Sequence, residues 1–248
     1  LIPIIVYLDK GKEKRPFLTK TELYSGLLAG AILFFGASLQ QKGLVSTSAG
    51  NACFITGVYV VLVPIFGIFW KHKTGSSIWM GVMLTVAGLY FLSIKDQLTI
   101  EKGDLLILLS TFFWANHVLF IAWISPKIDP IRLSSLQFLV VALLSTITTC
   151  FFETFEWQFI LNAKWPILYG GLMSVGIAYT LQVVAQRNAH PAYAAIILSS
   201  EAIFAVIGGI FILNESLSLR ASFGCLLMLL GMFSAQLPDI IRYLKNQN

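Results

Sequence analysis

The sequence predicts an all-α integral membrane protein built as an inverted repeat of two five-helix units. Three observations lead to this fold class. First, 57% of the residues are hydrophobic and only 12% are charged, whereas a soluble domain typically has about 45–50% apolar and about 25% charged residues. Second, the chain contains eight apolar runs long enough to cross a bilayer. Third, its two halves resemble each other at a fixed offset.

Membrane helices are expected wherever about 20 mostly apolar residues follow one another. Such runs occur at 21–43, 48–70, 76–94, 104–125, 131–152, 165–186, 191–213 and 218–237. The opening segment LIPIIVYL is apolar but too short to span, and it leads into DKGKEKRPFLTK. It lacks a charged n-region and a small-residue cleavage site, so it does not look like a signal peptide. We expect it to be the end of a helix whose beginning precedes this sequence.

The orientation follows from the Lys and Arg residues in the loops. Twelve of them fall in one alternating set of loops and five in the other. Because positively charged loops remain in the cytoplasm, we expect the DKGKEKR loop and the tail 238–248 to be cytoplasmic. The protein is then a multi-pass protein of the inner or plasma membrane.

An internal repeat relates the two halves of the chain. A shift of 143 residues superimposes small residues without a gap: Ala49 on Ala192, Ala52 on Ala195, Gly81 on Gly224 and Gly88 on Gly231. Small residues at this spacing let membrane helices pack closely. We expect a first repeat at 1–95, truncated at its N-terminus by one helix and most of a second, and a second repeat at 102–237. Five helices is an odd number, so the second repeat is inverted, and a ligand site is expected near the bilayer midplane.

Three segments resemble a known family. GDLLILLSTFFWA (103–115), AGNACFITGVYVVLVPIFGIF (49–69) and LSSEAIFAVIGGIFILNE (198–215) are similar to the drug/metabolite transporter superfamily, EamA-like family. In the ninth helix of that family a mid-helix Glu is often followed by Pro, whereas Glu201 is followed by Ala202, so no proline is present to kink this helix. The family's terminal Gly-Glu is Asn214-Glu215 here. The resemblance implies a secondary carrier that exports small metabolites or drugs.

Glu201 is the only charge within residues 194–213. A carboxylate at the centre of a membrane helix costs about 2.5–3.5 kcal/mol on insertion scales, so it should face the bundle interior or water. In a continuous helix it shares a small-residue face with Ala194, Leu198, Ala205 and Gly208. Two interpretations are open. Glu201 lines a central cavity and binds a cation or exchanges a proton, or it stays protonated and bonds a neighbouring helix.

The run 104–125 presents further polar groups on one helix face. Its His117 can bind or shuttle protons because an imidazole titrates near neutral pH, and Trp114 can stack on a planar or cationic substrate. Alternatively, His117 is neutral and hydrogen-bonded within the bundle. Asn51 and Gln137 could line the same cavity or join helices by hydrogen bonds. The predicted substrate pathway consists of Glu201, His117, Trp114, Ser110, Gln40, Tyr59, Tyr179 and Gln182.

Enzyme and metal motifs are not found in the sequence, which lacks H-E-x-x-H, a Walker-type loop and G-x-S-x-G. Cys53, Cys150 and Cys225 lie far apart in apolar runs without metal or disulfide spacing, and we expect them to be small core residues. The sequence contains no basic helix of the kind that binds nucleic acid. We expect no cofactor and no catalytic residue.

The expected function is secondary active transport, with export of a small metabolite, amino acid or drug-like molecule by alternating access. The expected partners are the small-molecule substrate and membrane lipid. Protons are the candidate coupling ion, and we expect a monomer. The alternatives are a membrane-embedded channel or enzyme, or a truncated and inactive transporter.

Overall fold

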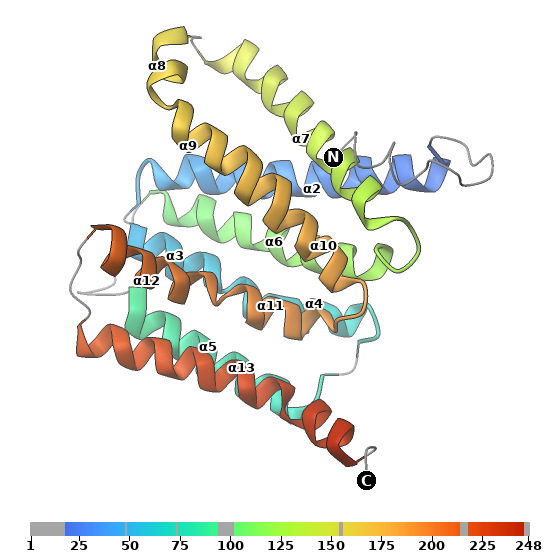
Figure 1. Cartoon of the computed structure of the whole chain (residues 1–248), viewed down its shortest axis with the longest axis vertical. Coiled ribbons are helices and arrows are strands. Elements are labelled where there is room, and N and C mark those ends of the chain that lie inside the picture. Colours follow the sequence, from blue (N-terminus) through green and yellow to red (C-terminus); the bar gives the residue numbers. More distant parts are fainter. Residues whose placement is uncertain are drawn as a thin grey trace. The chain divides into compact units, whose positions relative to one another are not determined.

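The computed structural model describes residues 18–47, 49–72, 74–93, 102–153, 156–213 and 218–245, which are helical with no strand among them (Figure 1). The helices are α2 (Lys20–Leu44), α3 (Ala49–Gly57), α4 (Tyr59–Phe69), α5 (Ser76–Ser93), α6 (Asp104–Ile124), α7 (Pro130–Phe152), α8 (Trp157–Asn162), α9 (Lys164–Tyr169), the π-helix η1 (Gly170–Tyr179), α10 (Thr180–Gln186), α11 (Pro191–Leu198), α12 (Glu201–Leu213) and α13 (Leu219–Lys245). The N-terminal segments LIPIIVYL and DKGKEKR, and Asn214-Glu215, lie outside the described residues.

Within the described residues, seven helical stretches are long and apolar enough to cross a membrane. They coincide with seven of the eight predicted runs. The eighth, predicted at 76–94, contains a shorter apolar helix at Ser76–Leu92. For the described residues, the predicted all-helical fold with several membrane spans is thus confirmed.

The cysteines depart from the prediction. Cys53 and Cys150 are exposed on the surface of the chain, and Cys225 is half-buried. Helix surfaces that face lipid are as apolar as the core of a membrane protein. An apolar run therefore identifies a span without identifying which of its residues are buried.

The helices form two compact units. One comprises the described residues up to Phe35 together with Phe120–Ala189, and the other comprises Gly36–Leu119 together with the described residues from His190 onward. Each unit takes segments from both halves of the sequence, and the division passes through α2 and α6. We call them the Phe120 unit and the His190 unit.

A buried ion pair joins two helix starts in the Phe120 unit. The Thr19 hydroxyl accepts a hydrogen bond from the Glu22 amide at 3.2 Å, and the Glu22 carboxylate accepts one from the Thr19 amide at 2.9 Å. This is a capping box for α2. Oε2 of Glu22 also lies 3.8 Å from Nη1 of Arg132 in the first turn of α7, and the two side chains are 0% and 6% exposed. Asp129 caps the same turn by accepting from the amides of Ile131 and Arg132.

Close helix contact in the Phe120 unit depends on the Gly26-x-x-x-Gly30 sequence of α2. A Cβ atom at Gly30 would lie only 2.8 Å from the carbonyl oxygen of Gln137 on α7. Only glycine leaves room for backbone to approach this closely. The core beside this contact contains Ala29, Ile121 and Leu133.

In the His190 unit, α5 and α13 pack against each other through glycines. A Cβ at Gly81 would lie 2.7 Å from the carbonyl oxygen of Gly231, and one at Gly88 would lie 2.6 Å from that of Gly224. The lower-numbered glycine of α5 thus meets the higher-numbered glycine of α13, so the two helices are antiparallel (Figure 1). The 143-residue shift pairs Gly81 with Gly224 and Gly88 with Gly231. Each of the two α5 glycines therefore contacts the α13 counterpart of the other α5 glycine.

The run predicted as one helix at 48–70 is interrupted. The helix α3 ends at Gly57 and α4 begins at Tyr59. At the break the Val58 amide donates to the Ile55 carbonyl at 3.0 Å, and the Val61 amide donates to the Val58 carbonyl at 2.9 Å. Hydrogen bonds across three residues instead of four tighten the backbone into a 3₁₀-like turn.

The run predicted at 191–213 is interrupted in the same way. The Ser200 amide donates to Ile197 at 3.0 Å and the Ile203 amide donates to Ser200 at 2.9 Å, again across three residues. The Ser199 hydroxyl donates to the Ile196 carbonyl at 2.6 Å, and such local serine bonds bend helices. This break forms without a proline. Because the 143-residue shift carries Val58 onto Glu201, the two interruptions fall at nearly equivalent positions.

Candidate functional site

Two of the predicted pathway residues meet in the His190 unit. The indole Nε1 of Trp114, on α6, donates a hydrogen bond to Oε1 of Gln40, on α2, at 2.8 Å. Both side chains are half-buried. The hydrogen bond occupies one edge of the indole and fixes its tilt, and the ring packs against the core cluster that contains Tyr59 and Ala195. The pair offers an oriented aromatic platform with a polar amide beside it.

His117 and Ser110 lie on the same helix as Trp114 but are buried. The imidazole of His117 is 1% exposed, and its ring lies edge-on to Trp114 with 6.5 Å between the ring centroids. The Ser110 hydroxyl donates to the Ile107 carbonyl of its own helix at 2.6 Å. The first interpretation, in which His117 binds or shuttles protons, requires that the imidazole be accessible, and the second does not. The burial of the side chain restricts this access in the present conformation.

Tyr59 links the two interrupted helices directly. It is the first residue of α4, immediately after the break at Val58, and its side chain is buried. Its hydroxyl donates to the Ala195 carbonyl on α11 at 3.2 Å. That carbonyl also accepts the Ser199 amide at 3.1 Å, so the tyrosine bonds to the last turn before the second break. Asn51, on α3, is buried as well.

Glu201 occupies a different setting from the one predicted. It is the first residue of α12, and its side chain is exposed on the chain surface, whereas Ala202 and Ile203 pack into a core cluster. The expected common face with Ala194 does not persist, because helical spacing does not carry across the break and Ala194 is buried. A carboxylate at a helix N-terminus is stabilised by the helix dipole by about 0.3–1 kcal/mol.

Tyr179, Gln182 and Gln137 belong to the Phe120 unit. Tyr179 ends the π-helix η1 and Gln182 follows on α10, both half-buried, while Gln137 is fully buried on α7. Their participation in one cavity with Trp114 stays a prediction.

The sequence reasoning missed two interactions. The acceptor of the Tyr59 bond is a backbone carbonyl, which no residue type marks. The Glu22–Arg132 pair was not predicted either, because a basic residue at the start of a membrane span is already accounted for by the loop charges that set the orientation. The Thr-x-x-Glu pattern at 19–22, directly before an apolar run, is the signal that could have drawn attention to Glu22.

The fold and the sequence have known counterparts. A crystal structure of a protein that is 15% identical superposes with a TM-score of 0.78 over 95% of this chain and 82% of that one, which shows a shared fold. An uncharacterized transporter of Archaeoglobus fulgidus is 31% identical over 223 residues, covering 90% of this chain and 71% of the relative. The uncharacterized transporter YoaV of Bacillus subtilis is 25% identical over 243 residues, covering 93% and 80%.

A multi-pass helical bundle with these relatives is a membrane transport protein. The sequence pattern of the EamA-like transporter family matches residues 1–94 and 101–235. The chain belongs to the EamA-like transporter family, as the resemblance of its three segments predicted.

Proposed function

We propose that the protein is a secondary active transporter that exports a small metabolite, amino acid or drug-like molecule by alternating access. The observation that carries the proposal is the pair of interrupted helices, α3–α4 and α11–α12. They break at nearly equivalent positions in the 143-residue register, and the Tyr59 hydroxyl connects them through the Ala195 carbonyl.

Interrupted membrane helices suit transport because irregular backbone at membrane depth is tolerated only where it is buried in protein or lines a water-filled cavity. A pair of interrupted segments at matching positions in two repeats marks a substrate site between inverted halves. The reciprocal glycine contacts of α5 and α13 support this inverted relation, because two-fold related helices make such exchanged contacts. We assign the repeats to residues 1–95 and 102–237.

The chemistry near the breaks favours a small amphipathic substrate. The Trp114 indole, held by Gln40, offers an aromatic surface, and His117 and Tyr59 add two polar groups in a mostly apolar environment. Small-molecule sites commonly combine apolar walls with a few polar groups. Glu201 at the start of α12 adds a carboxylate that can accept a cationic group or a coupling proton.

Counterflow in proteoliposomes tests the proposal. Vesicles containing the full-length protein are preloaded with a metabolite mixture, and labelled compounds are offered outside. A carrier that alternates access exchanges label inward against its own gradient, whereas a channel only dissipates the gradient. Absence of counterflow for all compounds, with leakage in its place, would exclude alternating access.

A Tyr59→Phe variant connects this assay to the interrupted helices. It removes a hydrogen bond whose net contribution is about 0.5–1.5 kcal/mol, and we expect a several-fold lower exchange rate. Tyr24→Phe is the matched control, because Tyr24 is largely exposed. Equal exchange by both variants would show that the Tyr59–Ala195 bond is not part of the transport machinery.

A further inference from the structure

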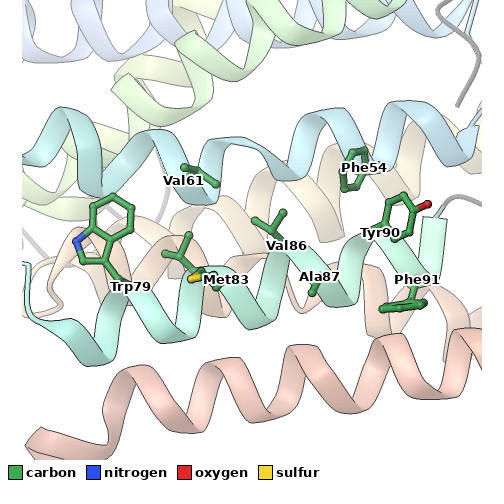
Figure 2. Close-up of a pocket in the computed structure, with 9 residues that line it drawn as sticks. Phe54, Val61, Trp79, Met83, Val86, Ala87, Tyr90 and Phe91 are labelled. Atoms are coloured by element: carbon green, nitrogen blue, oxygen red, sulfur yellow. The ribbon is translucent and has the colours of Figure 1, made fainter.

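An apolar groove of about 490 Å³ runs beside α5 in the His190 unit (Figure 2). One wall follows a face of α5 through Trp79, Met83, Val86 and Tyr90, and Phe54 and Val61 of α3 and α4 stand opposite. Its volume lies in the range of about 300–1,000 Å³ that is usual for small-molecule sites. All the lining side chains are aliphatic, aromatic or methionine, and none belongs to the predicted substrate pathway.

The groove is elongated. Trp79 and Phe91 mark its ends along α5, and helical rise places them about 18 Å apart. One leaflet of the hydrocarbon core is about 15 Å thick, half of about 30 Å. A groove of this length with purely apolar walls matches one extended acyl chain. A polar metabolite would find no hydrogen-bonding side chain along the middle of the groove.

The positively charged side chain of Arg220 lies at one end of the groove. Arg220, the second residue of α13, holds its Cζ atom 5.5 Å from the ring of Tyr90 and 5.9 Å from the ring of Phe91. These two rings form the end of the groove. The cation–π attraction of the two rings helps to position the guanidinium, and its planar fork of N–H donors matches the oxygens of a phosphate. Arg220 lies at a helix end, and the ends of membrane helices lie at the level of the lipid headgroups.

We propose that this groove and Arg220 together form a binding site for one anionic phospholipid of the surrounding bilayer. The acyl chain lies against α5 between Phe91 and Trp79, and the guanidinium of Arg220 binds the phosphate. The length and apolar lining of the groove select the chain, and the positive charge selects an anionic over a zwitterionic headgroup. The site is independent of the transported molecule.

Lipid titration followed by native mass spectrometry tests this site. The full-length protein in detergent is titrated with phosphatidylglycerol and, separately, with phosphatidylcholine of the same chain length. The wild type should bind the first phosphatidylglycerol more tightly. Because one basic residue near a membrane surface contributes roughly a fivefold preference for anionic lipid, Arg220→Gln should lose about that preference while retaining phosphatidylcholine binding.

Two further variants separate the groove from the charge. Ala87→Phe fills the groove and should weaken binding of both lipids, and Met83→Trp does so from an exposed position if Ala87→Phe folds poorly. Lys127→Gln is the matched control, because Lys127 stacks over Trp123 at 3.5 Å but does not border the groove. The proposal is overturned if Arg220→Gln keeps the preference, if Lys127→Gln loses as much, or if a folded groove-filling variant binds lipid like the wild type.

Discussion

Alanine in place of Gly88 should separate α5 from α13. A Cβ at this position would lie 2.5 Å from Cγ of Met228, 2.6 Å from the Gly224 carbonyl oxygen and 2.9 Å from the Met228 amide nitrogen. The Met228 side chain can rotate away, but the two backbone atoms move only if the helices move. The carbonyl contact is 0.8 Å shorter than the 3.4 Å at which ordinary contact begins.

The size of the effect follows from this displacement. Moving packed surfaces apart by about 0.5–1 Å forfeits a quarter to a half of their dispersion energy, and overpacking typically costs about 1–3 kcal/mol. The higher helix propensity of alanine offsets up to about 1 kcal/mol of this loss in stability. We expect a net loss of about 1–2 kcal/mol, which for a chain of this size lowers the melting temperature by roughly 2–8 °C.

Thermal unfolding in detergent, followed by tryptophan fluorescence and size-exclusion chromatography, measures this loss. Gly208→Ala is the control, because a Cβ at Gly208 on α12 would meet nothing within 4 Å. That variant should keep or slightly raise the melting temperature. If Gly88→Ala is as stable as Gly208→Ala, close backbone contact is not what holds α5 to α13.

Three further outcomes are expected. Glu22→Ala leaves the buried Arg132 without its carboxylate and should cost about 3–5 kcal/mol in denaturant unfolding; a loss no larger than that of the exposed Glu153→Ala would contradict the pairing. Glu201→Gln should express and fold normally but lose transport or its pH dependence in proteoliposomes, and full pH-dependent transport would assign Glu201 a structural role. A reporter fused to the C-terminus should be active in the cytoplasm, and activity only on the opposite side would reverse the predicted orientation.

The positions of the membrane helices could be predicted because each depends on a long apolar run, a property of side chains. The interruptions at Val58 and at Ser199–Ser200 could not, because they are changes in backbone hydrogen bonding, and the glycine and serine residues beside them also occur in continuous membrane helices. With Ala202 in place of a proline, the second break has no strong marker. The competing bond of the Ser199 hydroxyl is visible only once the helix is built.

The candidate site was predictable in its residue types and less so in its pairings. An indole and an amide within membrane helices have to find partners, so Trp114 and Gln40 could be singled out individually. That they bond each other across 74 positions in the sequence depends on how α2 and α6 pack. Glu201 shows the opposite case, where a face computed for a continuous helix fails because the helix is not continuous.

The exchanged glycine contacts allow the two sides of the α5–α13 seam to differ. Gly88 packs on Met228, and Gly231 packs on Thr85, and the 143-residue shift makes Thr85 the counterpart of Met228. Two identical chains meeting about a two-fold axis would carry the same residue at both places, so any mutation would act twice. In a single fused chain a hydroxyl occupies one side and a thioether the other. A substitution at Thr85 or at Met228 can therefore change the packing at one end of the seam while leaving the other end unchanged.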